Sequence, residues 1–239
     1  MNMKDFENKI INADCLDILK QLPDKCIDLV LTDPPYRVIS GGKSEQYKNS
    51  IFKNNDGKIF KENDMNHEEW ISEVFRVLKD GGEFYCMSNS LNLFDLKAIC
   101  DKAGFRFHNL LVWEKNNATP NRWYLKNCEY TLYFYKGNAK AINNKESKTV
   151  HKFQNTIDRI HPTEKPEELM RFYISNSSRE GDLVLEPFSG SGVVARACYD
   201  LKRKFICIEK DFDYWKASCK RLEDHQRFLH SIFLLLPSL

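Results

Sequence analysis

The chain has 239 residues, a formal net charge of +2 and 42% hydrophobic residues. This length suits one α/β domain with a full core and excludes two domains of that size. No signal peptide opens the chain and no apolar run approaches the length of a membrane span, so we expect a cytoplasmic protein that does not bind membranes. Eight cysteines lie mostly in apolar runs without a Cys-x-x-Cys pair, which predicts reduced core thiols and no metal site.

Strands and helices are predicted to alternate along the chain. The helical spacing of apolar residues predicts a helix over 67–79 that ends at a Gly81-Gly82 C-cap. Pro166 and the two glutamates after it indicate another helix start, and further helices are expected over 193–201 and from Phe212. Apolar segments predict seven strands, at about 8–12, 27–32, 83–88, 107–113, 129–135, 182–186 and 204–208. This alternation predicts a doubly wound, Rossmann-like sheet, and we expect the apolar end, 228–236, to pack on it.

The second predicted strand ends in Asp33, Pro34, Pro35 and Tyr36. Open α/β sheets bind ligands at the carboxyl ends of their strands. The prolines stiffen the loop, and an ionised Asp33 with a nearby carbonyl can accept both hydrogens of an amino group. Tyr36 offers a flat face on which a ring can stack. Taken alone, the motif is equally consistent with a proline-rich turn capped by an aspartate.

A second strand runs into an acid and a glycine-rich turn before a helix. Glu186 ends this strand, and Gly190 and Gly192 permit positive φ and a close approach of the backbone to a ligand. Glu209 ends the following strand, at about the spacing of the acid that binds ribose in nucleotide-type folds. The third glycine and the lysine of a P-loop are missing, so we expect a cofactor that contains ribose but no pyrophosphate.

Through these two strand-tip motifs, the chain resembles the S-adenosylmethionine-dependent amino-methyltransferases that act on adenine N6 or cytosine N4 of DNA. It is most similar to their β group, in which Asp-Pro-Pro-Tyr precedes Phe-x-Gly-x-Gly. The likeness covers nearly the whole chain through the blocks 9–36, 113–117 with Arg122 and 129–130, 161–166 and 186–192. Two positions differ from the usual pattern, Glu186 where Asp is common and Ala13 where Gly is common.

This resemblance implies the seven-stranded methyltransferase sheet, circularly permuted, with the 129–135 strand antiparallel in an edge hairpin. It also implies S-adenosylmethionine as the cofactor, with Asp14 at its adenine and Glu209 at its ribose. Thr163 and Lys165 are expected to hold the cofactor's carboxylate or the adjoining loop, or simply to begin the helix at Pro166. Asp14 is equally suited to cap a helix over 15–22. The cofactor-binding residues expected from the resemblance are Asp14, Cys15, Asp33, Thr163, Lys165, Glu186, Pro187, Phe188, Ser189, Gly190, Ser191, Gly192, Glu209 and Lys210.

The reaction implied is direct methyl transfer to a flipped-out adenine, with Asp33, Pro34, Pro35 and Tyr36 as the catalytic residues. Cytosine N4 in DNA, adenine in RNA and a glutamine side chain are the alternative targets. Asp33 favours adenine, because cytosine-N4 members more often have Ser and the glutamine enzymes usually have Asn there. A non-catalytic DNA-binding relative is a further alternative, although both motifs are intact.

Positive charge is concentrated between Lys115 and Arg159, where nine Lys or Arg accompany three acids. An ordinary solvated loop is one interpretation; phosphate contact beside a base-binding site is the other. We treat 1–239 as one methyltransferase domain, with 136–160 as a short target-recognition loop and 37–66 as a lid or a disordered insertion. The residues expected to contact nucleic acid are Lys115, Asn116, Arg122, Lys126, Lys136 and Lys140. The expected partners are double-stranded DNA, a cognate restriction endonuclease and a second copy of the chain.

Overall fold

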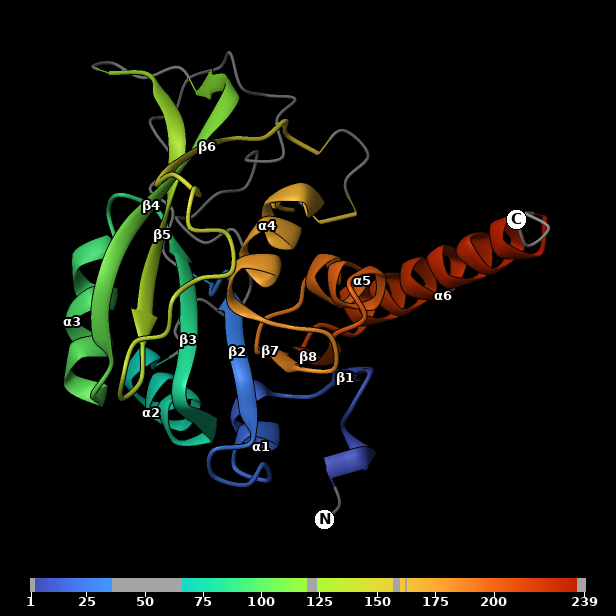
Figure 1. The fold of residues 1–239 in the computed structure, drawn as a ribbon, viewed down its shortest axis with the longest axis horizontal. Helices are drawn as coiled ribbons and strands as arrows, with labels where there is room; N and C mark the ends of the chain where they lie inside the picture. Colours follow the sequence, from blue (N-terminus) through green and yellow to red (C-terminus); the bar gives the residue numbers. More distant parts are fainter. Residues whose placement is uncertain (1–2, 36–65, 120–123, 157–159, 162, 236–239) are drawn as a thin grey trace.

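The structure, a computed structural model, describes residues 3–35, 66–119, 124–156, 160–161 and 163–235, and it gives no side-chain surroundings for 119 and 232–235. A central sheet runs through the molecule, and helices cover both of its faces (Figure 1). The predicted doubly wound architecture is confirmed. Tyr36, Arg122, Pro162 and the predicted lid, 37–66 but for its last residue, lie outside the described residues.

The described sheet has eight strands in the order β1-β8-β7-β2-β3-β5-β4-β6. All neighbouring pairs are parallel except those of β5, which runs antiparallel to both β3 and β4. The strands are β1 (Lys9–Asn12), β2 (Ile27–Thr32), β3 (Leu78–Ser88), β4 (Arg106–Thr119), β5 (Lys126–Tyr135), β6 (Val150–Lys152), β7 (Leu183–Glu186) and β8 (Lys204–Glu209).

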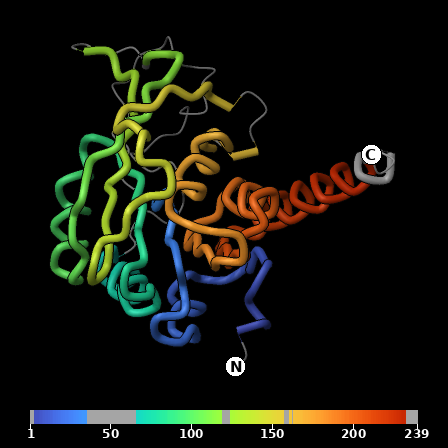
Figure 2. The backbone as a smooth tube through the Cα atoms, in the orientation of Figure 1, coloured from blue at the N-terminus to red at the C-terminus, as the bar shows by residue number. Residues whose placement is uncertain are grey.

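Two details of the predicted sheet are wrong. The eighth strand, β6, was assigned to a loop, because three residues are too short to show an alternating pattern. The antiparallel strand β5 is also not at the edge, since β4 and β6 lie outside it. Strand β2 lies beside β7, where Leu29 pairs with Val184. Strands far apart in sequence therefore end side by side, as the blue and orange segments of Figure 2 show.

Helices divide into two groups, one on each face of the sheet. One group is α1 (Cys15–Leu19), α2 (His67–Val77) and α3 (Leu93–Ala103), and the other is α4 (Glu167–Ser177), α5 (Val193–Asp200) and α6 (Phe212–Leu235). A short 3₁₀ turn, η1 (Met3–Asp5), precedes β1.

Alternate side chains of β2 enter two different hydrophobic cores. Val30 packs in the core with α1–α3, while Leu29 and Leu31 pack in the core with α4–α6. All three are fully buried, and each such side chain contributes about 1.5–3 kcal/mol through loss of apolar surface from water. Because both faces of β2 are buried, its sequence is a nearly continuous apolar run. The same packing holds the end of the strand in position.

The end of α2 differs from the prediction. The helix ends at Val77 with an extended cap at Leu78, and Gly81 and Gly82 lie inside β3. Gly81 has φ of +74° and donates its N–H to the Lys136 carbonyl at 2.7 Å, so its conformation serves the sheet. A glycine pair does not by itself distinguish a helix cap from a strand irregularity.

The last helix, α6, begins at Phe212 as predicted and extends away from the sheet (Figure 1). Leu222 is buried against the second core, but Phe228 is 62% exposed. The expectation that the apolar end packs on the sheet is therefore wrong for the described part of it. No helix among the described residues is both long and apolar enough to cross a membrane.

Candidate active site

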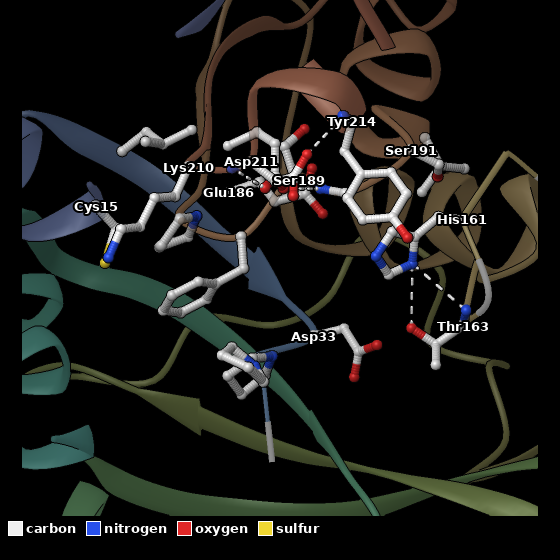
Figure 3. A pocket seen from close by; sticks show the side chains of 18 of the residues that line it. Cys15, Asp33, His161, Thr163, Glu186, Ser189, Ser191, Lys210, Asp211 and Tyr214 are labelled. Carbon is white, nitrogen blue, oxygen red and sulfur yellow. Dashed lines mark hydrogen bonds between the residues drawn. The ribbon is translucent and has the colours of Figure 1, made fainter. Parts of the chain in front are cut away.

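A cavity of about 550 Å³ lies at the carboxyl ends of β1, β8, β7 and β2. That volume is within the range of small-molecule sites. Asp33 lies on the opposite side of the cavity from Ser189 and Tyr214 (Figure 3). The predicted residues that line it are Asp14, Cys15, Asp33, Pro34, Pro35, Thr163, Lys165, Glu186, Pro187, Phe188, Ser189, Gly190, Ser191, Glu209 and Lys210.

The glycine-rich turn forms one wall of the cavity. Gly190 has φ of +50° and faces the cavity, where an added Cβ would lie 3.6 Å from the His161 ring. Gly192 has φ of +71°, but its Cβ would meet Ser218 Cβ at 2.9 Å and Ile10 at 3.2 Å. Gly192 therefore allows the turn to pack against α6 and β1, and it is not among the residues that line the cavity.

Glu209 is held by backbone donors at the end of β8. Its Oε2 accepts from the Gly190 N–H at 2.7 Å, and its Oε1 accepts from the Asp211 N–H at 2.9 Å. Burial raises the pKa of Glu209, although these hydrogen bonds oppose the shift. A carboxylate has about four lone-pair positions, so Glu209 can accept further hydrogen bonds from the cavity.

Glu186 and Cys15 line the cavity as weakly ionised groups. Burial raises the pKa of Glu186 well above its ordinary value, although hydrogen bonds from Ser189 and Cys207 oppose the shift. Burial, followed by the charge of Asp14, raises the pKa of Cys15 to about 12. Both environments favour the protonated form, so neither group is a strong nucleophile or anion near neutral pH.

The turn after β1 closes another side. Asp14 caps α1 by accepting from the Leu16 N–H at 2.9 Å, which confirms the predicted cap, although the helix ends at Leu19. The other Asp14 oxygen lies 3.4 Å from Lys210 Nζ. This pairing places a carboxylate and an ammonium at the cavity rim, where polar groups of a nucleoside can reach them.

The loop before α4 supplies residues that the sequence did not single out. The His161 ring lies edge-on to Tyr214 at 4.4 Å, and its Nδ1 lies 3.3 Å from Thr163 Oγ1. Burial, then the charge of Lys165, lowers the pKa of His161 to about 4, so its ring is neutral at physiological pH. Asp211 and Tyr214 also line the cavity. Both residues closely follow Glu209 in the sequence. The prediction of a site residue at the tip of β8 could therefore have been extended to the residues at the start of the next helix.

The tip of β2 carries the strongest charge contact of the site. Lys165 Nζ forms an ion pair with Asp33 Oδ2 and lies 3.3 Å from Glu129 Oε2. Glu129 Oε1 in turn lies 3.2 Å from Lys115 Nζ. Pro34 and Pro35 add no N–H donors here. Glu129 belongs to the 129–130 block of the resemblance, and it lies beside Lys165 without lining the cavity.

The predicted nucleic-acid residues fall into two places. Asn116 and Lys126 are exposed on the β4–β5 hairpin, which extends beyond the carboxyl edge of the sheet (Figure 1). Lys115, on the same hairpin, is directed to Glu129. Exposed apolar side chains accompany them, since Tyr124 is 92% and Leu125 59% exposed. This hairpin is the part of the positive segment that lies next to the cavity.

Lys136 and Lys140 lie at the other end of the sheet from the cavity. Lys136 is 6% exposed, and its Nζ donates to the carbonyls of Phe75 at 2.5 Å and Leu78 at 2.7 Å. It therefore satisfies carbonyls at the end of α2. Lys140 is exposed beside Gly81, near the start of β3.

The predicted recognition loop is divided in the same way. Asn143 donates to the carbonyls of Ser175 and Ser178 at the far end of α4. Beyond β6 the chain reaches the hairpin, where the Asn155 side chain donates to Asn117 at 2.6 Å. Within the described part of 136–160, the residues after 149 thus lie beside the β4–β5 hairpin. The residues before 149 are held at the far end of α4.

Known proteins match this chain over most of its length. A type II methyltransferase of Streptococcus pneumoniae, M2.DpnII, is 30% identical over 92% of this chain and 92% of its own. A second, M2.MboI of Moraxella bovis, is 29% identical over 90% of this chain and 87% of its own. The crystal structure of the M1.HpyAVI–SAM complex superposes with a TM-score of 0.67 at 26% identity, covering 89% of this chain and 98% of that one.

The sequence model of the DNA methylase family matches residues 27–220, a range that includes the tip of β2, the loop before α4, the glycine-rich turn and Glu209. By this match and the likeness of the whole chain to the two type II enzymes, the protein belongs to the DNA methylase family of S-adenosylmethionine-dependent methyltransferases.

Proposed function

We propose that the protein methylates adenine N6 in double-stranded DNA, with S-adenosylmethionine as the methyl donor. The observation that carries the proposal is the single cavity formed by the Asp33 tip and the glycine-rich turn. Neighbouring strands β2 and β7 bring these two segments together. An amine held at Asp33 would therefore lie across from a ligand held at Gly190 and Glu209.

The cofactor residues support this donor. Glu209 has unused acceptor positions facing the cavity, as ribose hydroxyls require. The Gly190 backbone lies open to the cavity without a side chain, and Phe188 adds an apolar ring that packs edge-on against Trp70 at 5.1 Å. Asp14 and Lys210 provide a carboxylate and an ammonium at the rim for the adenine and nearby polar groups. When bound, the cofactor supplies an electrophilic methyl group.

The chain's own contribution to the reaction is to activate and position a poor nucleophile. The lone pair of an adenine amine is delocalised into the ring. Hydrogen bonds from the amine to Asp33 and the Pro34 carbonyl favour a pyramidal nitrogen and direct its lone pair toward the glycine-rich turn. As the new N–C bond forms and the bond between the methyl group and the sulfonium sulfur breaks, the amine would become cationic, and the negative charge of Asp33 would stabilise it until its proton passes to water.

The target base must leave the duplex to reach this cavity. Tyr36, outside the described residues, is proposed to stack on it. Lys126, Asn116 and the exposed Tyr124 on the β4–β5 hairpin are the proposed DNA contacts, together with Arg122, which is outside the described residues. A cognate restriction endonuclease fits the type II names of the relatives and stays a prediction, as does a homodimer.

Tritiated methyl transfer to unmethylated DNA, RNA and protein in parallel tests the substrate. We expect label in DNA alone, and the Asp33→Ala variant serves as the blank. Label in RNA or protein without label in DNA would overturn the proposal. Hydrolysis of the labelled DNA to nucleosides then separates methylated adenine from methylated cytosine.

A further inference from the structure

Four charged side chains form a line that begins at the catalytic carboxylate. Lys165 contacts Asp33 and lies 3.3 Å from Glu129, and Lys115 lies 3.2 Å from the other oxygen of Glu129. The four residues come from the tip of β2, the loop before α4, β5 and β4. The charges alternate in sign at each contact, so each ion has an opposite charge beside it.

The ammonium of Lys165 is buried and therefore needs oppositely charged or hydrogen-bonding partners. Its side chain is 6% exposed, and a buried charge is tolerated when it is paired and hydrogen-bonded. Among the described residues, the Lys165 ammonium has acceptors at Asp33, Glu129 and the Thr163 carbonyl, the last at 3.3 Å. These protein contacts include the adjoining loop, one of the two contacts that the resemblance implies for Lys165 beside the cofactor's carboxylate.

Glu129 is a second carboxylate partner of Lys165 beside Asp33. Burial acts to raise the pKa of Glu129, but the charges of Lys165 and Lys115 outweigh it, and the pKa lies below its ordinary value. Glu129 is therefore ionised at neutral pH. An anion in contact with Lys165 restricts the position of the ammonium that meets Asp33.

We propose that Lys165 is the positioning residue of the catalytic carboxylate, keeping Asp33 ionised and oriented for the amine, and that Glu129 acts through Lys165. This inference rests on the proposed function, because it assigns the roles around the same amine-binding carboxylate. Lys165 occupies an acceptor position of one Asp33 oxygen, so the incoming amine is confined to the positions that remain. The amine's orientation thus depends on a residue 132 positions away from Asp33 in the sequence.

Other titratable groups also face this line. Asp33 acts electrostatically on Glu186 from β7 and Cys86 from β3, and Lys165 acts on His161. Burial raises the pKa of Glu186 and Cys86 well above their ordinary values, and burial followed by the charge of Lys165 lowers that of His161 to about 4. All three shifts favour uncharged forms. Among the described residues, Lys165 is the cation that forms an ion pair with Asp33.

The test compares Lys165→Met with Lys165→Arg in three measurements: binding of S-adenosylmethionine by calorimetry, the pH profile of single-turnover methyl transfer, and thermal unfolding. Lys102→Met is the matched control, because Lys102 is an exposed lysine paired with Glu68. For Lys165→Met we expect transfer at neutral pH to fall about 100-fold through misplacement of the carboxylate. Its acid limb should move to higher pH by about one unit or more, since the opposing cation is gone. Cofactor affinity should stay within about threefold of the parent, because the donors of Lys165 serve protein acceptors.

Three further variants, Lys165→Arg, Glu129→Gln and the double variant, distinguish an electrostatic role of Lys165 from a simple loss of packing. Lys165→Arg keeps the charge and should recover part of the rate and most of the acid limb. Glu129→Gln alone should lower the rate by less than Lys165→Met. In Lys165→Met with Glu129→Gln, the acid limb should lie between those of the parent and Lys165→Met, because one of two facing carboxylates has been neutralised.

Two results would overturn the proposal. One is a loss of cofactor affinity of more than about tenfold in Lys165→Met with an unchanged acid limb, which would make Lys165 a cofactor ligand. The other is an unchanged rate and an unchanged limb. Carbon-13 NMR titration of the Asp33 carboxyl, in parent and variants without DNA, gives the same comparison without activity. It separates this inference from the proposed function, which fails if the parent transfers no methyl group to DNA.

Discussion

The cofactor side and the base side of the cavity are built by different means. On the cofactor side, Glu209 is fixed by the backbone N–H groups of Gly190 and Asp211, each within about 20 positions of it. On the base side, Asp33 is fixed by the side chain of Lys165, 132 positions away. Backbone geometry at a strand tip is set by local sequence, whereas a side-chain ion pair depends on several segments meeting. Single substitutions on one side should therefore impair cofactor binding, and single substitutions on the other side should impair methyl transfer.

The largest expected effect is on the base side. Asp33→Ala should reduce methyl transfer by at least about 100–1,000-fold, because the charge that stabilises the developing cationic amine is removed. Binding of S-adenosylmethionine should stay nearly unchanged, since Glu209 and the glycine-rich turn are intact. Calorimetry beside single-turnover kinetics measures both, with Asp33→Asn as the isosteric control. Loss of cofactor binding together with activity would place Asp33 on the cofactor side instead.

On the cofactor side, Glu209→Ala should weaken binding of S-adenosylmethionine by about 10–100-fold, the value of one or more hydrogen bonds to a charged group. Transfer at saturating cofactor should fall much less. Calorimetric affinity is the measurement, and Glu180→Ala, an exposed glutamate paired with Lys202, is the control. Equal affinity of Glu209→Ala and parent would remove Glu209 from the ribose role.

Lys136 and Lys126 belong to the same positively charged segment, but they lie at different ends of the sheet. Substitution of Lys136 should therefore affect stability, and substitution of Lys126 should affect DNA binding. Lys136→Met should lower the free energy of unfolding by about 2–3 kcal/mol, since carbonyls at the end of α2 lose a charged donor. DNA affinity of the folded variant should not change. Urea unfolding and fluorescence anisotropy with duplex DNA test the two parts. A weaker DNA complex with unchanged stability would restore the phosphate role of Lys136.

A smaller effect is expected on the hairpin. Lys126→Ala should weaken DNA binding several-fold and reduce the salt slope by about one, as expected for one lost phosphate contact. Lys140→Ala is the matched control, because Lys140 is also exposed but lies at the other end of the sheet. Equal salt slopes for these two variants would mean that the hairpin is not the DNA-facing surface.

The smallest effect concerns Glu186 and pH. Its pKa is raised in the folded protein, so the folded state binds more protons than the unfolded state above the ordinary carboxyl pKa, and Glu186 lowers stability as pH rises through that interval. Glu186→Gln removes this loss. The melting temperature of the variant, relative to the parent, should therefore rise with pH between about 4.5 and the raised value. A difference independent of pH would contradict the raised pKa.

Local patterns predicted much of this protein. Val30 and its neighbours mark β2 because a strand buried on both faces needs a continuous apolar run, and Asp33 follows at its end. The glycine-rich turn is equally readable, since the positive φ of Gly190 is a conformation that favours glycine. Both segments depend on contacts within a few residues, and both are where the sequence placed them.

Long-range contacts were not readable from residue types. Lys136 and Lys126 look alike in the sequence, yet one is buried at carbonyl oxygens and the other is exposed on the hairpin. The pairing of Lys165 with Asp33 and Glu129 joins three distant segments, and no spacing rule connects them. Counts of charge thus locate a positive segment but not the face on which each charge acts.

The central claim is that Asp33 holds an adenine amine of DNA opposite the methyl donor. Mass spectrometry of nucleosides from the genomic DNA of cells expressing the protein tests it most directly, with cells expressing Asp33→Ala as the reference. The account predicts N6-methyldeoxyadenosine in the first sample and none above background in the second. N4-methyldeoxycytidine instead, or equal amounts of methylated adenine in both samples, would contradict it.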